Sequence, residues 1–398
     1  MKLIIVVALI FLIALVGSRR TFARVKLPLG AQHIFLTGTE FIFVGLFLGG
    51  VFLNILDEKM IKELHPFLSL GLAWIGLLFG IQLDFRKLIR FPIQYFLVAM
   101  LQAIFTLLVV FFPFYFILDR FFPSESNLIF VALVLSAAAA PTAQSALALV
   151  PRDDAQHGRR LMRLLRYVSG MDGLVGLVIL GFVLCFSEFH TVGGEGFLAT
   201  WQWLLISIGL GVVIGFIFHV LTSSRVASEE LLLVVLGMII FSGGIALYLN
   251  LSPLFVNFII GMVIANLSHA KNRIASILLS GEKSVYIIFL ILVGATWHLG
   301  SAWAFALAGI YFVIRLIGKI CGGYLATRMF KTVLNVPASV GLGLVSQGGM
   351  AIVIVINFQQ VYHSVLTNVV VTMVLLATLV NEIISPALAQ RVLKQQTT

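Results

Sequence analysis

Residues 136–145 read Ser-Ala-Ala-Ala-Ala-Pro-Thr-Ala-Gln-Ser and stand inside an apolar run that extends from about residue 127 to about residue 150. Pro141 lacks a backbone N–H and its ring clashes with the preceding helical turn, so a continuous helix is not expected through it. The sequence therefore predicts a span made of two half-helices, which frees backbone polar groups near the middle of the run.

A second small-residue stretch, Gly-Leu-Gly-Leu-Val-Ser-Gln-Gly-Gly at 341–349, interrupts another apolar run, and Gly348 and Gly349 close it. In the order of spans given below, the two interrupted runs are the fifth and the twelfth, so each is the middle one of three. An offset of seven spans makes the two triplets inverted in the membrane. Inverted repeats with broken helices are typical of secondary transporters, whose ion site lies where the half-helices meet.

The composition excludes a soluble protein. Of 398 residues, 61% are hydrophobic and 11% are charged, and the mean hydropathy is +1.11. Two cysteines, both in apolar runs, provide neither a disulfide framework nor a cysteine metal cluster. The net charge of +10 needs no nucleic-acid partner, because basic loops beside membrane spans account for it. We therefore expect an all-α polytopic membrane protein with a single membrane domain over residues 1–398.

Thirteen apolar runs approach the length that a helix needs to cross a hydrocarbon core of roughly 30 Å. They lie at about 2–17, 38–56, 66–83, 93–118, 127–150, 165–187, 199–221, 230–248, 251–268, 282–298, 302–327, 334–358 and 364–390. Of the 26 Lys and Arg residues, 20 fall in loops on one side and four on the other. Because basic loops stay in the cytoplasm, this predicts an external N-terminus and a cytoplasmic C-terminus. The basic residues after the first run favour a retained span over a cleaved signal peptide.

Four charged side chains fall deep inside the apolar runs: Asp172, Arg315, Lys319 and Glu382. A charge at membrane depth costs on the order of 3 kcal/mol, so each is a functional candidate. Helical rise, counted from the basic residue that ends each span, predicts one shared layer for Asp172, Lys319 and Glu382. Arg315 would lie one turn deeper, where a structural or electrostatic role is expected. The competing interpretations are a static ion pair for Asp172 with Lys319 and a local helix-end arrangement for Glu382.

Six segments occur in an order that resembles the monovalent cation/proton antiporters of the sodium/proton exchanger superfamily. They are LSLGLAWIGLLFGIQLDFRKL at 68–88, GMDGLVGLVIL at 170–180, LSPLFVNFIIGMVIAN at 251–266, IIFLILVG at 287–294, IGKICGGY at 317–324 and the interrupted stretch at 341–353. The resemblance covers nearly the whole chain and implies the sodium/proton antiporter fold with two crossing discontinuous helices. It also implies a homodimer, with an ion-transport core at 93–187 and 302–390 and scaffold or dimerisation helices at 2–83 and 199–298.

Carried over by residue, the resemblance assigns Asp172 as the carboxylate that binds the ion and the proton, and Lys319 as the membrane lysine that pairs with it. The sequence departs from the family pattern at two places. Asp172 is flanked by Met171 and Gly173 where many members have Asp-Asp or Asn-Asp, and the interrupted stretches carry Gln347 and Gly349 in place of an acid or arginine. A single acid predicts electroneutral exchange unless Glu382 supplies a second carboxylate.

These features predict an antiporter that exchanges Na⁺ or K⁺ for H⁺ by alternating access, with Asp172 as the shared metal-ion and proton site. Cation and proton would compete for the same oxygens. Because hard cations prefer oxygen ligands, the expected neutral ligands are freed backbone carbonyls and the side chains of Thr142, Ser145, Ser169, Ser346 and Gln347. No cofactor is expected.

Two alternatives belong to other classes. An ion channel or gated cation pore could use the same scaffold, and dependence of flux on a proton gradient would distinguish the two. An intramembrane hydrolase would need two close carboxylates or a serine with a histidine at depth, and the eight His lie in loops or near span ends. We expect a multi-pass protein of a bacterial or archaeal cell membrane that serves pH homeostasis, with the lipid bilayer, the cation and the proton as its partners.

Overall fold

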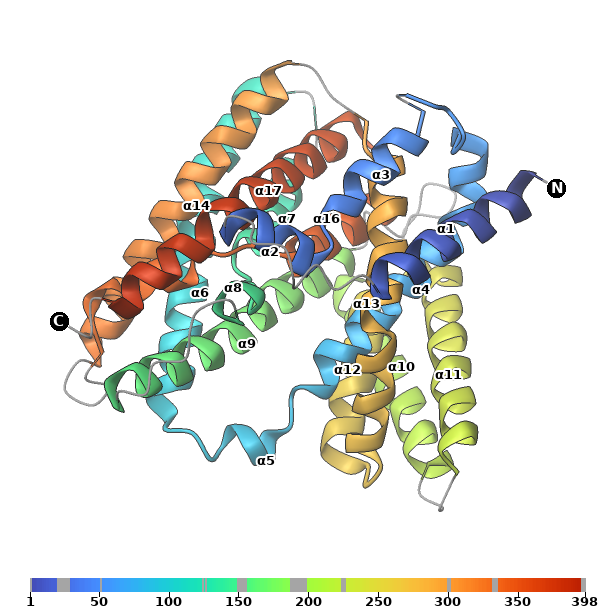
Figure 1. Ribbon diagram of the computed structural model, residues 1–398, viewed down its shortest axis with the longest axis horizontal. Helices are drawn as coiled ribbons and strands as arrows, with labels where there is room; N and C mark the ends of the chain where they lie inside the picture. The colour runs from blue at the N-terminus through green and yellow to red at the C-terminus, as the bar shows by residue number, and fades with distance from the viewer. Residues whose placement is uncertain are drawn as a thin grey trace. The chain divides into compact units, whose positions relative to one another are not determined.

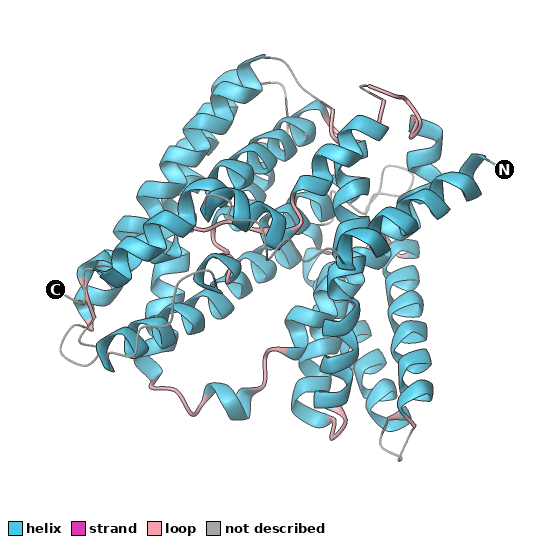
Figure 2. Ribbon diagram, viewed as in Figure 1, coloured by secondary structure: helices cyan, strands magenta, loops and turns pink. Residues whose placement is uncertain are grey.

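The computed structural model describes the chain except for residues 1, 20–28, 51, 124, 126, 149–155, 187–198, 223–226, 299–301, 331–335 and 395–398. The described residues form helices joined by loops, with no strand among them, as Figures 1 and 2 show. The all-α fold class predicted from the sequence is confirmed. The helices group into two compact units, and each is described by itself.

The first unit comprises residues 1–21, 38–90 and 184–297. Its helices are α1 (Lys2–Arg19), α3 (Glu40–Leu48), α4 (Glu58–Ile81), α5 (Phe85–Leu88), α10 (Thr200–Leu221), α11 (Ser228–Tyr248), α12 (Pro253–Leu267) and α13 (Lys271–Thr296). Helices α4 and α12 pack closely, because a Cβ on Gly80 would lie 2.1 Å from the carbonyl oxygen of Phe258, and one on Gly261 would lie 2.5 Å from that of Leu77. Small residues permit this backbone approach, which commonly joins helices inside a membrane.

Asp84 joins the loop after α4 to the start of α13 in the first unit. Its buried carboxylate accepts a hydrogen bond from the Lys271 ammonium at 2.6 Å. Beside it, the Asn266 side chain donates to the carbonyl of Leu83 at 2.8 Å and accepts from the backbone N–H of Phe85 at 3.0 Å. The hydrogen bond from Lys271 holds the pKa of the Asp84 carboxyl below its usual value. This contact stabilises the end of α4 against the start of α13.

The second unit comprises residues 22–37, 91–183 and 298–398. It is built from α2 (Leu29–Thr37), α6 (Ile93–Phe121), α7 (Leu128–Ala139), α8 (Ser145–Ala148), α9 (Gln156–Leu184), α14 (Ala302–Met329), the 3₁₀ helix η2 (Ala338–Leu344), α16 (Gly349–Val361) and α17 (Val365–Lys394). Two of its spans are interrupted. Helix α7 ends two residues before Pro141, and the chain is non-helical until α8 begins; η2 is likewise followed by a non-helical segment, 345–348, before α16.

The two interrupted segments touch where each leaves its helix. The backbone N–H of Ala143 donates to the carbonyl of Ser346 at 3.1 Å. A Cβ on Gly348 would lie 2.7 Å from the Cβ of Ala143, which is closer than such atoms approach without displacement. Glycine at 348 therefore permits the crossing, and backbone groups that a continuous helix would have used remain available to side chains.

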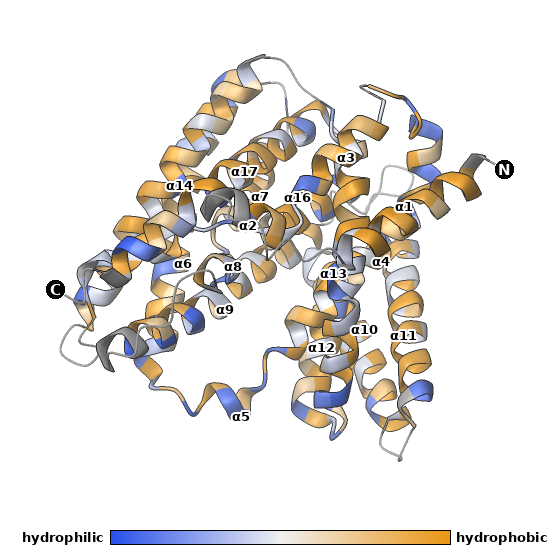
Figure 3. Cartoon of the chain, in the orientation of Figure 1, coloured by the Kyte–Doolittle hydropathy of each residue, from blue (hydrophilic) through white to orange (hydrophobic). Residues whose placement is uncertain are grey.

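Eight of the described helices are long and apolar enough to span a bilayer, and Leu3–Ser18, α7, α12 and α16 are shorter apolar helices. Figure 3 shows this apolar character along most of the helices. The expected span at 38–56 is helical only over α3, because the backbone becomes extended at Gly49. Helix α2 forms in a segment that the sequence predicted as a loop, and Gly38, with φ of 81°, separates it from α3. The count of thirteen spans and the orientation stay predictions.

Candidate ion-binding site

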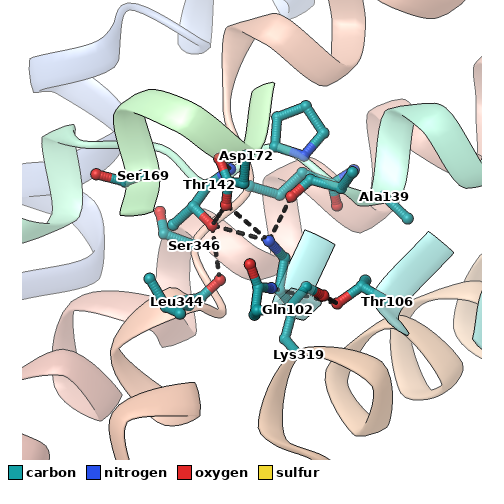
Figure 4. Close-up of polar contacts among 12 residues, drawn as sticks. Gln102, Thr106, Ala139, Thr142, Ser169, Asp172, Lys319, Leu344 and Ser346 are labelled. Atoms are coloured by element: carbon teal, nitrogen blue, oxygen red, sulfur yellow. Dashed lines mark hydrogen bonds and ion pairs between the residues drawn. The ribbon is translucent and has the colours of Figure 1, made fainter. Parts of the chain in front are cut away.

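Asp172 lies in the middle of α9, in the second unit, and is fully buried. The backbone N–H of Thr142 donates to its Oδ1 at 3.1 Å, and the Thr142 hydroxyl donates to its Oδ2 (Figure 4). Pro141 explains why this N–H is available, because the chain has left the helix there and the N–H bonds a side chain instead of a carbonyl one turn earlier. The interrupted helix thus places two donors on one carboxylate.

Lys319 of α14 supplies the positive charge beside Asp172. Its Nζ lies 3.0 Å from Oδ2 of Asp172, and both side chains are fully buried. The ammonium also donates to the carbonyl of Ala140 and, at 2.9 Å, to Oγ1 of Thr142. An ammonium has three N–H donors, and these three contacts use all of them. One of the three donors is therefore committed to the carboxylate.

Arg315, one turn before Lys319 on α14, binds backbone carbonyls of both interrupted segments. Its Nε donates to Ala139 at 3.0 Å, its Nη1 donates to Val345, and its Nη2 donates to Pro141 at 3.0 Å and to Ser346 at 3.3 Å. These carbonyls carry partial negative charge where α7 and η2 end. The fully buried guanidinium therefore neutralises two helix ends and holds them side by side.

Gln347 joins three helices of the same unit. Its Nε2 donates to the carbonyl of Ala138 at 3.1 Å and to the Tyr311 hydroxyl at 3.2 Å, and its Oε1 accepts from Nδ2 of Asn381 at 3.2 Å. Gln347 is one of the ion ligands predicted from the sequence. In the structure, both ends of its amide form hydrogen bonds with other residues of the protein. Tyr311 was not singled out from the sequence, because it does not interrupt its apolar run with a charge, and Asn381 was considered only as part of a local helix-end arrangement around Glu382.

The other predicted ligands differ in what they contact. The Ser346 hydroxyl is buried and has no hydrogen-bond partner among the described residues, and Figure 4 shows it near Thr142. Ser169 donates to the carbonyl of Arg166 in its own helix at 3.2 Å, so its hydroxyl is bonded locally. The Ser145 hydroxyl lies 2.9 Å from Nε2 of His33 in α2. Ser346 is thus the predicted serine whose hydroxyl makes no hydrogen bond among the described residues.

Glu382 contacts residues of α2. It is fully buried in α17, its Oε2 accepts a hydrogen bond from the Thr37 hydroxyl at 3.1 Å, and its backbone carbonyl lies 3.0 Å from Nδ1 of His33. His33 also reaches Ser145, so this group joins α2, α8 and α17. The structure therefore brings Asp172, Lys319 and Thr142 into direct contact, and sets Glu382 against α2.

Gln102 of α6 is a polar residue beside the site that charge-based reasoning missed. It is fully buried, and its Nε2 donates to Oγ1 of Thr106 at 3.2 Å. Figure 4 draws both residues next to Lys319. The close approach of α6 depends on small residues in α14, because a Cβ on Gly318 would lie 3.2 Å from Cα of Thr106, and one on Gly322 3.1 Å from the carbonyl oxygen of Gln102.

Two interrupted helices that cross beside a buried carboxylate and ammonium define a secondary ion transporter. Comparison of the whole chain with known protein families leads to the same class of protein. Residues 4–394 match the model of the transmembrane sodium/hydrogen exchanger family, and the chain belongs to that family. It is therefore a secondary transporter for cation/proton antiport and not an enzyme, and the family needs no cofactor.

One solved structure with the same fold is the sodium proton antiporter MjNhaP1 from Methanocaldococcus jannaschii, determined at pH 8. The similarity covers 99% of both chains with a TM-score of 0.66, at 16% sequence identity. At that identity the similarity establishes the fold, including the crossing discontinuous helices, and leaves the site to be argued from this chain's own residues. No curated protein matches the chain.

Proposed function

We propose that this protein exchanges one Na⁺ or K⁺ for one H⁺ by alternating access, with Asp172 as the group that binds both. The observation that supports this most directly is the 3.0 Å pair between the fully buried Asp172 and Lys319 at the point where the interrupted helices meet. A buried pair contributes little to stability, because desolvation offsets the attraction between the charges. Its presence at the crossing is better explained by binding.

Competition for one oxygen provides the coupling. Oδ2 of Asp172 accepts from both Lys319 and Thr142. A cation that binds Oδ2 takes the place of the ammonium as the positive partner, and a proton on Oδ2 removes the negative charge that holds the ammonium. In both cases Lys319 must release the carboxylate. Cation and proton therefore exclude each other at Asp172. The site changes its exposure from one side of the membrane to the other with the cation bound in one half of the cycle and with the proton bound in the other half.

The cation needs further oxygen ligands, because Na⁺ and K⁺ are hard ions. Thr142 can supply its hydroxyl oxygen if the hydroxyl hydrogen turns to the carbonyl of Leu344, which lies 3.2 Å away. Ser346 can supply its hydroxyl oxygen, which has no hydrogen-bond partner among the described residues. We assign these two as the neutral side-chain ligands, because Thr142 contacts Asp172 and Ser346 has no hydrogen-bond partner among the described residues. Ser145, Ser169 and Gln347 already bind other groups of the protein.

One carboxylate that carries either one cation or one proton gives both loaded forms the same charge. Exchange is therefore expected to be one for one and electroneutral. Glu382 is the group that could change this, as a fully buried second acid in the same unit. Its Oε2 accepts a hydrogen bond from Thr37 on α2, and this contact supports the single-carboxylate scheme.

The test uses the purified full chain in proteoliposomes that contain a proton-sensitive dye. An outward Na⁺ or K⁺ gradient should drive proton uptake in wild type, and an imposed pH gradient should drive cation movement in the opposite direction. Cation flux without coupled proton movement would contradict antiport and indicate the channel alternative.

The proposal also includes a homodimer, a cytoplasmic C-terminus and a bacterial or archaeal cell membrane. Crosslinking in the bilayer tests the homodimer, and the accessibility of terminal tags tests the side on which the C-terminus lies.

A further inference from the structure

The amide of Gln102 has one oxygen that is not bonded. Gln102 is fully buried in α6, and its Oε1 has no hydrogen-bond partner among the described residues. A buried carbonyl oxygen without a donor is destabilising, so its presence needs a reason. Gln102 faces the helix that carries Lys319, because a Cβ on Gly322 of α14 would lie 3.1 Å from the Gln102 carbonyl oxygen, and Figure 4 draws the two side chains in the same view of the site.

The bonds of Thr106 fix which end of the amide faces it. The Thr106 hydroxyl donates its single hydrogen to the backbone carbonyl of Gln102 at 2.9 Å. The Thr106 oxygen can then only accept from the Gln102 side chain, so the group 3.2 Å from it must be the Nε2 donor. The remaining atom of the amide is the acceptor, Oε1.

Lys319 needs such an acceptor during the exchange cycle. Its three N–H donors bind Ala140, Thr142 and Asp172. When a cation or a proton occupies Asp172, one N–H of a fully buried ammonium loses its partner. An unpaired donor on a buried charge costs more than a neutral one, so an alternative acceptor within reach lowers the free energy of both loaded forms.

We propose that Gln102 is a positioning residue that accepts Lys319 through Oε1 when Asp172 is loaded. The proposal rests on the function proposed above and names the second partner of its lysine. Gln102 does not contact the cation. It acts through Lys319, and it sets the affinity for cation and proton together, because both must displace the same ammonium.

The expected result follows from the loss of that acceptor. Gln102→Met keeps the length of the side chain and removes the amide, so the loaded forms lose a charge-assisted hydrogen bond. In proteoliposomes the apparent KM for Na⁺ should rise roughly tenfold or more, and the pH profile should move to acid, with little change in the rate at saturating Na⁺. Gln102→Asn, whose oxygen is one methylene group short, should shift both readouts in the same direction.

Two controls separate this role from a structural one. Gln359→Met makes the same substitution in α16, at a part-buried amide that binds Asn368 at 3.0 Å, and should leave the KM and the pH profile unchanged. In a Lys319→Ala background, Gln102→Met should have no further effect, because the lysine through which it acts is gone. Na⁺-dependent thermal stabilisation of the purified protein provides the same comparison for any variant with slow flux.

The outcomes distinguish this inference from the proposed function. If wild type shows no Na⁺-dependent or K⁺-dependent proton flux, the proposed function fails. If wild type is active and the Gln102 variants retain its KM and pH profile, the role of Gln102 is overturned while Asp172 exchange stands. An equal effect of Gln102→Met with and without Lys319 would also overturn it, because Gln102 would then act independently of the lysine.

Discussion

Arg315 offers a stability effect that can be worked out from the contacts of its side chain. Its guanidinium donates to the carbonyls of Ala139, Pro141, Val345 and Ser346. Ser346 also receives the N–H of Ala143, so the other three carbonyls depend most on the arginine. Arg315→Met retains much of the apolar volume and removes every donor.

The magnitude follows from these three carbonyls. Each buried polar group that loses its partner costs about 1–3 kcal/mol, so the lower end of that range gives about 3 kcal/mol in the free energy of unfolding. The two negative helix ends would also face each other without the intervening charge. We therefore expect Arg315→Met to unfold at a lower temperature than wild type in detergent and to lose Na⁺-dependent proton flux in proteoliposomes.

The controls for Arg315 use the same helix. Arg315→Lys keeps the charge but replaces a planar fork by a single ammonium, so its stability should lie between wild type and Arg315→Met. Arg328→Met removes an exposed arginine near the end of α14 and should change the free energy of unfolding by no more than about 0.5 kcal/mol. If Arg315→Met unfolds like Arg328→Met and still transports, the guanidinium does not hold the crossing together.

Four further outcomes are expected. Asp172→Asn should abolish exchange in protein that still inserts, because an amide has no exchangeable proton and no charge; residual cation-dependent proton flux in the purified variant would remove Asp172 from the scheme. Lys319→Ala should move the pH profile of exchange to alkaline, since the ammonium no longer competes for Oδ2, and an unchanged profile with full transport would refute the pairing. Asp84→Asn should lower the unfolding temperature at neutral pH, because Lys271 stabilises the ionised carboxyl; since the folded pKa of Asp84 is lowered, the wild-type advantage exists above its ordinary pKa of about 4 and disappears as pH falls through the folded value. Na⁺/H⁺ exchange should not respond to a membrane potential clamped with a potassium ionophore, and a voltage response that Glu382→Gln abolishes would assign a second charge to Glu382.

The sequence predicted the depth of the charged residues along their helices better than the direction in which their side chains point. Counting helical rise placed Asp172 and Lys319 in one layer, and their charged atoms lie 3.0 Å apart. The same count put Glu382 in that layer, yet its carboxylate contacts Thr37. Rise along a helix is the same for every face, whereas rotation about the axis depends on packing that one sequence does not reveal.

Neutral polar residues were the harder part of the site. A buried charge stands out in an apolar run because its cost is large. Gln102 and Tyr311 cost less and do not stand out, although Tyr311 binds Gln347 and Figure 4 draws Gln102 with Lys319. The contacts of Arg315 were also beyond the sequence, because its partners are backbone carbonyls, which every residue has and which only the interrupted segments leave available.

The two buried cations of α14, Arg315 and Lys319, differ in the number of hydrogen bonds they make. Arg315 holds carbonyls of both interrupted segments through three of its nitrogens, and none of these contacts involves Asp172. Binding of a cation or a proton to Asp172 would therefore break none of the guanidinium's hydrogen bonds. Lys319 has fewer donors, and one of them is bound to Oδ2 of Asp172, the oxygen for which cation and proton compete in the proposed scheme. Because a flexible ammonium loses and regains a single bond more readily than a planar fork, Lys319 is the cation that can respond in each cycle while Arg315 keeps the crossing in place.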